Sequence, residues 1–251
     1  MELLDQPLLV FVATFVVLWL AAWLGALWGR RRRGRSVEDV RGDFNIVETA
    51  ALGLLGLVIG FTFSMAMSRY DQRKNYEEEE ANAIGTEYLR ADLLPEPDGA
   101  RVRELLRRYL DLRIQNYMAG NDDSLRRIDA DTIRVQNELW AAVSGLAKAE
   151  QPMSVVMLAT GGMNDVLNSQ GYAQAAWRNR IPLEAWLLLF AIALCCNVLL
   201  GYGVRRLEPR LFMVLPLVVA IAFFLIAEID SPRSGLIRVR PQNLETLRHS
   251  R

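Results

Sequence analysis

The densest group of reactive side chains in the chain is an uninterrupted run of four acids, Glu77 to Glu80. Successive residues of a helix point about 100° apart, so these carboxylates do not converge on one point, and we expect no metal site there. The run instead covers the whole circumference of one helical turn. Some of the acids must therefore face other protein, where a buried carboxylate needs a partner. We expect Glu79, Glu80 and Asn82 to make contacts within a helical bundle or between subunits.

The other residues that might suggest catalysis lack the partners that each chemistry needs. Gly161-Gly162 is not followed by Lys-Ser/Thr, so it does not make a phosphate-binding loop. Cys195 and Cys196 are adjacent within an uncharged stretch, which is typical of small apolar packing residues. The single histidine, His249, stands near the C-terminus and has no evident partner. Neither a Ser/His/Asp pattern nor a dinucleotide fingerprint is present, so we expect no enzyme and no cofactor.

The distribution of charge indicates the elements that position these residues. The chain has 251 residues, is 52% hydrophobic, and carries 29 Lys and Arg against 29 Asp and Glu. This balance gives no basic face for nucleic acid, and the hydrophobic fraction excludes intrinsic disorder. The two cysteines cannot form a disulfide scaffold. Charge is nevertheless absent from several long stretches and concentrated in the middle of the chain.

Four uncharged stretches of 17 to 21 residues are suited to helices that cross a bilayer core of about 30 Å. Lipid offers no hydrogen-bond partners, so such spans must be helical, with a kink expected at Pro216. The N-terminus carries no positive charge, which favours a retained first span over a cleaved signal peptide. We predict a multi-pass membrane protein with spans at 8–28, 46–67, 182–204 and 211–229. Between and around them lie a tail at 1–7, loops at 29–45 and 205–210, a helical domain at 68–181 and a tail at 230–251.

The charged middle of the chain has helical periodicity throughout, so we predict an all-α protein. Residues 68–180 hold 15 Lys and Arg against 18 Asp and Glu. The second span is expected to continue as one helix to Leu94, and further helices follow Gly99, Asp122 and Pro152. The pairs Arg73–Glu77 and Lys74–Glu78 are spaced like ion pairs on a solvated helix face.

The side of the membrane on which this domain lies is left open by the sequence. Arginines in the two short loops favour cytoplasmic loops and an outer location for residues 68–181. When the residues that flank the spans on the opposite side are counted as well, the two loops carry nine Lys and Arg and the opposite side carries eight. The tail at 230–251 begins with a turn at Ser231-Pro232, and its apolar residues either lie along the membrane surface or pack on the bundle.

Three segments carry a family resemblance: GLVIGFTFSMAMSRYDQRKNYEEEEANAIGTEYLRADLLPEP, NRIPLEAW and SPRSGLIRV. In this order and spacing, over about residues 45 to 245, the chain resembles the bestrophin-like domain family of bacterial membrane proteins. The family is named for a distant similarity to bestrophins, which are pentameric anion channels with four membrane segments and a helical cytosolic domain. The resemblance implies a homo-oligomeric ion channel, a pentamer if it follows bestrophins, for anions such as chloride in the bacterial inner membrane. It also implies a cytosolic middle domain, in contrast to the count of positive charges.

The resemblance further implies a pore on the second span. Bestrophins line a narrow neck with apolar side chains at i, i+4 and i+8, and Ile59, Phe63 and Met67 have this spacing. A ring of such side chains would gate by dewetting. One and two turns beyond Met67, Arg69 and Arg73 would place positive charge at the pore mouth and favour anions.

Small residues on the other faces of the second span favour close packing of helices, namely Gly53, Gly56 and Gly60. Nothing in the chain resembles the acidic calcium clasp of bestrophins, so calcium gating is not expected. A second hypothesis is a membrane-anchored helical interaction or sensor module that does not conduct, because the charged middle is larger than a simple pore requires.

Overall fold

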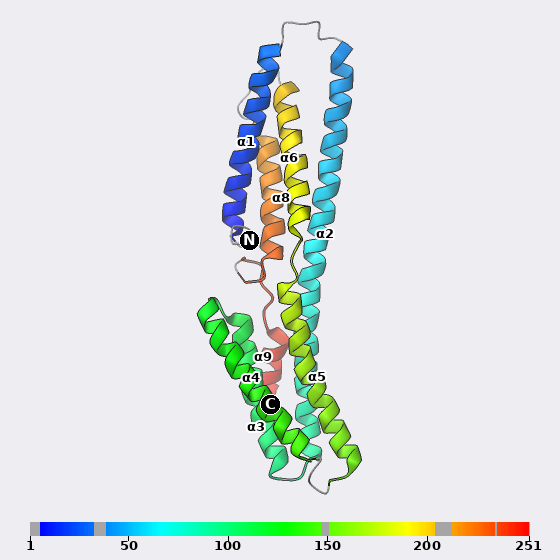
Figure 1. Cartoon of the computed structure of the whole chain (residues 1–251), viewed down its shortest axis with the longest axis vertical. Coiled ribbons are helices and arrows are strands. Elements are labelled where there is room, and N and C mark those ends of the chain that lie inside the picture. The colour runs from blue at the N-terminus through cyan, green and yellow to red at the C-terminus, as the bar shows by residue number, and fades with distance from the viewer. Residues whose placement is uncertain (1–5, 33–38, 147–150, 204–211, 234, 251) are drawn as a thin grey trace. The chain divides into compact units, whose positions relative to one another are not determined.

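The chain folds into helices that group into two compact units. The computed structural model describes residues 6–32, 39–146, 151–203, 212–233 and 235–250. Every regular element in these ranges is a helix, which confirms the predicted all-α class (Figure 1). The membrane unit comprises Met1–Arg69 and Arg180–Ile237, and the helical unit comprises Tyr70–Asn179 and Arg238–Arg251.

The membrane unit is built from apolar helices that pack along their lengths. Its helices are α1 (Pro7–Arg32), the first part of α2 (Asp39–Arg90), α6 (Leu183–Gly203) and α8 (Val214–Asp230). Helix α1 packs against both α6 and α8. A Cβ added at Gly201 would fall on the carbonyl of Ala22, and one at Gly25 would fall on the carbonyl of Val198. These glycines therefore allow the backbones of α1 and α6 to approach closely.

Three helical stretches are long and apolar enough to cross a membrane: Pro7–Arg31, Phe44–Leu93 and Met153–Gly203. They contain the first two predicted spans and the third up to Gly203, the last residue of that span lying outside the described ranges. The fourth predicted span, 211–229, corresponds to α8, a helix of 17 residues, and its first residue lies outside the described ranges. Pro216 is buried within α8. The bilayer is therefore the environment of this chain, and the fourth crossing stays a prediction.

The helical unit surrounds a continuous apolar core. It contains the remainder of α2, a short 3-10 turn η1 (Ala91–Leu93), α3 (Asp98–Met118), α4 (Asp122–Leu146), α5 (Met153–Arg178) and α9 (Gln242–Ser250). Leu106, Tyr109, Leu139 and Met163 are almost fully buried in this core. Each aliphatic side chain buried in this way contributes about 1.5–3 kcal/mol to folding. Figure 1 shows α3, α4 and α5 following one another as long helices.

The breaks between these helices fall where the sequence predicts them. Helix α2 ends at Arg90 and is followed by η1, short of Pro95 and Pro97. Gly99 lies in the first turn of α3, where a Cβ would crowd the carbonyl of Ala91. Pro152 precedes α5, as its fixed φ favours at a helix start.

The C-terminal tail packs on the helical unit rather than being free to lie on a membrane surface. Val239 and Leu244 are buried in the core of that unit, and Leu247 packs against it. Helix α9, which carries Leu244 and Leu247, was not predicted from the sequence. Of the two alternatives for the tail, packing on the bundle is the one observed for residues 238–250.

Helix α2 buries one face whose chemistry changes along its length. In the membrane unit the buried positions are Leu55, Thr62 and Ala66. In the helical unit they are Arg73, Glu77, Glu80, Ala81, Ile84 and Glu87, together with Gly85. The prediction of a solvated Arg73–Glu77 pair is wrong, because both residues are buried.

Candidate functional site

The proposed neck residues share one face of α2 in the membrane unit. Ile59 is half-buried, whereas the side chains of Phe63 and Met67 are 37% and 38% exposed. Phe61, two residues before Phe63 and on a different face, is 65% exposed. The apolar neck face is thus open in the single chain and available for contacts with lipid or with further subunits.

The two arginines predicted for the pore mouth have different environments. Arg69 is partly buried, its Nη2 lies 3.7 Å from the sulfur of Met65, and its Nη1 is buried without a hydrogen-bond partner among the described residues. Arg73 is 1% exposed, and its Nε donates a hydrogen bond of 3.4 Å to the carbonyl of Ala176 on α5. A side chain that faces an open pore is not buried in this way, so the structure places Arg73 inside the helical unit.

The three glycines predicted to support helix packing face open space. A Cβ added at Gly53, Gly56 or Gly60 would meet no described atom within 4 Å. No described helix of the chain therefore packs closely at these positions. Within the single chain, the close approach is made by Gly25 and Gly201 instead.

The acidic run separates into two inward and two outward residues. Glu77 and Glu80 are buried, whereas Glu78 and Glu79 are exposed, and so is Asn82. Of the three residues predicted for bundle or subunit contacts, Glu80 is therefore the one inside the bundle. Glu79 and Asn82 lie on the surface of the single chain.

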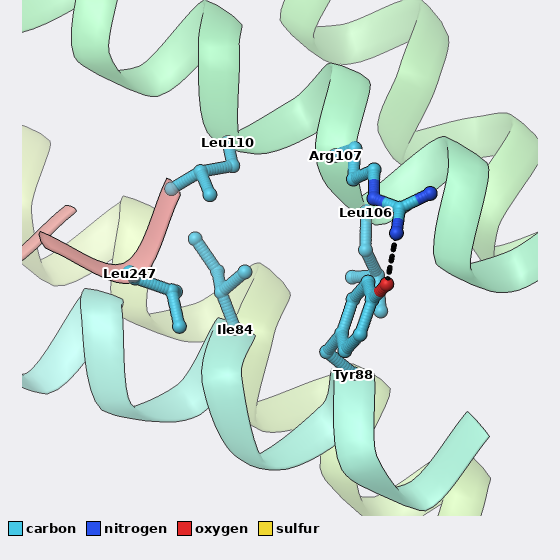
Figure 2. Close-up of a pocket in the computed structure, with 6 residues that line it drawn as sticks. All are labelled: Ile84, Tyr88, Leu106, Arg107, Leu110 and Leu247. Carbon is cyan, nitrogen blue, oxygen red and sulfur yellow. Dashed lines mark hydrogen bonds between the residues drawn. The ribbon is translucent and has the colours of Figure 1, made fainter. Parts of the chain in front are cut away.

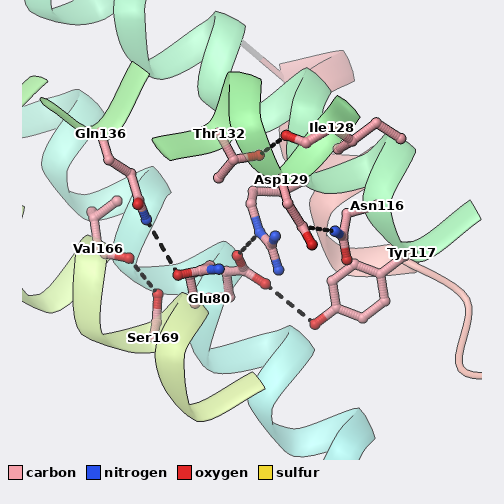
Figure 3. A network of polar contacts seen from close by, with 11 residues as sticks. Glu80, Asn116, Tyr117, Ile128, Asp129, Thr132, Gln136, Val166 and Ser169 are labelled. Carbon is pink, nitrogen blue, oxygen red and sulfur yellow. Dashed lines mark hydrogen bonds and ion pairs between the residues drawn. The ribbon is translucent and has the colours of Figure 1, made fainter. Parts of the chain in front are cut away.

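Glu80 lies at the centre of a buried polar network between α2 and α3 (Figure 3). Arg113 Nε donates to Glu80 Oε1, and the hydroxyl of Tyr117 donates to Oε2 over 3.2 Å. Burial acts to lower the pKa of Arg113, but the charge of Glu80 outweighs it and the net shift is upward. Burial and the same carboxylate raise the pKa of Tyr117. The guanidinium therefore stays charged, and the tyrosine stays a hydrogen-bond donor.

Glu77 binds the N-terminus of α9. Its Oε1 accepts the backbone N–H groups of Asn243 and Leu244 over 2.9 and 3.0 Å, and its Oε2 accepts the Asn243 side-chain amide over 2.7 Å. A carboxylate is the natural partner of free N–H groups at a helix start. Burial raises the pKa of Glu77, while these hydrogen bonds oppose the shift. The sequence signal that could have predicted α9 was Pro241 followed by Leu244 and Leu247.

Glu87 is the buried acid that has no hydrogen bond. It is 0% exposed, and neither carboxylate oxygen has a hydrogen-bond partner among the described residues. Arg90 Nη1 lies 3.7 Å from Glu87 Oε2, one turn along the same helix. Burial raises the pKa of Glu87 to about 7, with Arg90 lowering it and Asp165 of α5 adding to the rise.

A small cleft lies between α2, α3 and α9 in the helical unit (Figure 2). Its lining consists of Ile84, Tyr88, Leu106, Arg107, Leu110 and Leu247. Arg107 donates a hydrogen bond to the Tyr88 hydroxyl at one end of the cleft. The empty space amounts to about 200 Å³, including open solvent, and is smaller than the ~300 Å³ of typical ligand pockets. We assign it no ligand.

The described residues contain no group of three His, Cys, Asp or Glu side chains arranged to hold a metal ion. Cys195 is exposed, Cys196 is buried, and both are free thiols. His249 Nδ1 lies 2.7 Å from the carbonyl of Glu245, one turn earlier in α9.

These features define an all-helical integral membrane protein with a charged helical unit. The chain belongs to the Bestrophin-like domain family, which it matches over residues 12–244, and the resemblance seen in the sequence is thereby confirmed. Bacterial Bestrophin homolog structures from Klebsiella pneumoniae, each with one substitution, have the same fold. Two of them are 14% identical to this chain, with TM-scores of 0.65 and 0.66, and the alignments cover 95% of this chain and 99% and 97% of those chains. A crystal structure described as a membrane protein, also 14% identical, gives a TM-score of 0.68 and covers 95% of this chain and 96% of that one. No protein of curated function matches.

Proposed function

We propose that this protein is a homo-oligomeric channel for inorganic anions in the bacterial inner membrane, with Ile59, Phe63 and Met67 as its neck. The observation that carries the proposal is the open apolar face of α2, on which these three residues follow one another at helical spacing. Membership of the Bestrophin-like family supports it, because bestrophins are oligomeric anion channels.

An apolar neck would gate by excluding water. When several copies of α2 surround one axis, the side chains of Ile59, Phe63 and Met67 form three stacked rings one helical turn apart. Ions cross such a constriction only when it is wide enough to stay hydrated. Phe63 is the largest of the three side chains and would set the narrowest ring.

Positive charge next to the neck would give the channel its preference for anions. Arg69 lies two residues beyond Met67, and its buried Nη1 has no hydrogen-bond partner among the described residues. In an assembled ring its charge would favour anions over cations. Arg73 is left out of the proposed mouth because it is buried against α5. Gly53, Gly56 and Gly60 have room for a neighbouring copy of α2 or α6.

The topology that we propose has four crossings, with α8 as the fourth and the helical unit on one side. The family resemblance favours the cytosol for this unit, whereas the count of Lys and Arg in short loops favours the outside. Labelling of single cysteines in intact cells decides between them. A cysteine at Asp122 that reacts with a membrane-impermeant reagent, together with an unreactive one at Arg33, places the helical unit outside.

The channel is tested with purified full-length protein in planar bilayers or in chloride-loaded vesicles. Wild-type protein should give anion-selective currents, and Phe63→Ala should change unitary conductance or open probability. Phe61→Ala is the matched control, because Phe61 is an exposed aromatic residue of the same helix on another face. It should leave the currents unchanged. Arg69→Gln should reduce the ratio of anion to cation permeability.

The oligomeric state separates the channel from the alternative of a non-conducting interaction module. Exposed apolar side chains in the helical unit, such as Met153 and Met157, suit contacts with other proteins. Mass measurement corrected for detergent should give a ring of four or more copies for a channel. Monomers or dimers, or well-folded oligomers that pass no current, would favour the module and overturn the proposed function.

A further inference from the structure

A buried carboxylate joins α2 to α5 in the helical unit. Glu87 of α2 is fully buried, and its carboxylate lies against Gly162 of α5. A Cβ added at Gly162 would fall on Glu87 Oε2 and on Arg90 Nη1, so a glycine is needed for this contact. Gly161, the neighbouring residue, faces open space. Gly162 thus makes room for an acidic side chain between two helices, whereas Gly161 does not take part.

The carboxylate of Glu87 lacks the partners that its buried neighbours have. Glu77 accepts three hydrogen bonds, and Glu80 accepts bonds from Arg113 and Tyr117. Glu87 accepts none from the described residues, and its nearest cation, Arg90, lies 3.7 Å away with its side chain partly exposed. A buried carboxylate without hydrogen bonds is costly when ionised and much less costly when protonated.

We propose that Glu87 is a proton-controlled contact: protonation of its carboxyl tightens the packing of α2 against α5, and ionisation loosens it. The neutral carboxyl fits the apolar contact with Gly162, whereas the anion draws water or Arg90 towards itself. Two charged groups act on it, namely Arg90 from its own helix, which favours the anion, and Asp165 from α5, which disfavours it. The inference concerns the helical unit and does not depend on ion conduction.

The protonation equilibrium lies in the physiological range. Burial raises the pKa of Glu87 to about 7 from an ordinary value of 4.5. The folded state therefore holds a proton that the unfolded chain releases between these two values. Stability from this proton is complete below pH 4.5 and is lost as the pH rises through 7. Acidification from pH 8 to 5.5 should raise the ratio of folded to unfolded protein roughly 30-fold through this group.

Infrared spectroscopy of the purified full-length protein observes the proton directly. The absorption band of a protonated carboxyl should disappear with a midpoint near pH 7 in the wild-type protein. The component with this midpoint should be absent from Glu87→Gln, in which an amide of similar shape replaces the acid. Glu79→Gln, which removes an exposed acid from the same helix, should leave that component unchanged.

Two further variants should move the midpoint in opposite directions. Arg90→Gln removes the nearest cation and should raise it by about one pH unit. Asp165→Asn removes a neighbouring negative charge and should lower it by less, because its side chain is exposed to water. These changes in the titration midpoint require no change in fold. They therefore test the proposal even if Glu87→Gln is poorly stable.

Thermal unfolding between pH 5.5 and 8 measures how protonation of Glu87 changes the stability of the fold. Glu77 also has a raised pKa and adds to the slope, so the informative quantity is the difference between wild-type protein and Glu87→Gln. That variant should lose the 30-fold component, and Glu79→Gln should retain it. A Glu87→Gln protein that keeps the wild-type slope, or a carboxyl band whose midpoint lies near pH 4.5, would overturn the proposal.

Discussion

Removal of one partner of the buried Glu80–Arg113 ion pair should be far more damaging than removal of an exposed ion pair. Glu80 is 0% exposed and Arg113 is 2% exposed. The variant Arg113→Met keeps a similar side-chain volume but leaves the Glu80 carboxylate buried with Tyr117 as its donor. An uncompensated charge of this kind costs about 3–5 kcal/mol. For a chain of this size, the unfolding temperature should fall on the order of 10 °C.

The matched control is an ion pair of the same chemistry on the surface of α4. Arg134 Nη2 lies 2.6 Å from Asp131, and the two side chains are 54% and 50% exposed. Arg134→Met should therefore cost under about 1 kcal/mol. Circular dichroism of purified full-length proteins, heated at one rate in one detergent, measures both. Equal unfolding temperatures for the Arg113 and Arg134 variants would refute the reasoning.

A double variant separates the ion pair from ordinary packing. Replacing both charges, as in Glu80→Leu with Arg113→Met, removes the unpaired carboxylate and should recover most of the lost stability. Recovery should stop short of the wild-type value, because the hydroxyl of Tyr117 then lacks its acceptor, at a cost of about 1–3 kcal/mol. A double variant no more stable than Arg113→Met would indicate that packing of the arginine stem dominates.

Two more substitutions probe the contacts of α2 with α5 and α9. Gly162→Ala should destabilise the helical unit by about 1–3 kcal/mol, because its Cβ collides with Glu87, whereas Gly161→Ala should be neutral or stabilising by up to ~1 kcal/mol. Thermal unfolding measures both, and equal effects would contradict the glycine contact. Glu77→Ala should free the start of α9 and cost about 1–3 kcal/mol, and limited proteolysis should then remove the C-terminal residues faster than in Glu79→Ala. Equal cleavage rates would rule out Glu77 as the residue that holds α9.

The sequence predicts the helices of this chain well because their ends carry local signals. Pro95 and Pro97 follow η1, Gly99 lies in the first turn of α3, and Pro152 precedes α5. Length and lack of charge identify three apolar spans by composition alone. The fourth depends on α8, whose 17 residues are marginal for a crossing. Helix α9 was missed because its position depends on a hydrogen bond to Glu77, which is distant in sequence.

The candidate site is harder to predict because partners, rather than patterns, decide which faces are buried. Arg73 and Glu77 have the i, i+4 spacing of a solvated ion pair, yet both are buried. Glu78, on the other hand, is exposed. An acid on a helix can lie inside when a donor from another helix meets it, and the sequence of α2 alone contains no information on that donor. The same holds for the neck face of α2: its proposed partners belong to other copies of the chain, so the sequence of α2 does not reveal them.

The buried acids of α2 support the assignment of Glu87 by comparison with one another. Glu77 is met by the start of α9, and Glu80 by Arg113 and Tyr117, so each of these carboxylates has hydrogen-bond donors. Such fully satisfied groups rigidify a core. Glu87 lies on the same face about two to three turns further along, but it meets Gly162, which offers no side-chain donor. Helices α3 and α9 supply donors to Glu80 and Glu77, whereas no described residue supplies one to Glu87. An acid without donors is stable in a core only while it keeps its proton.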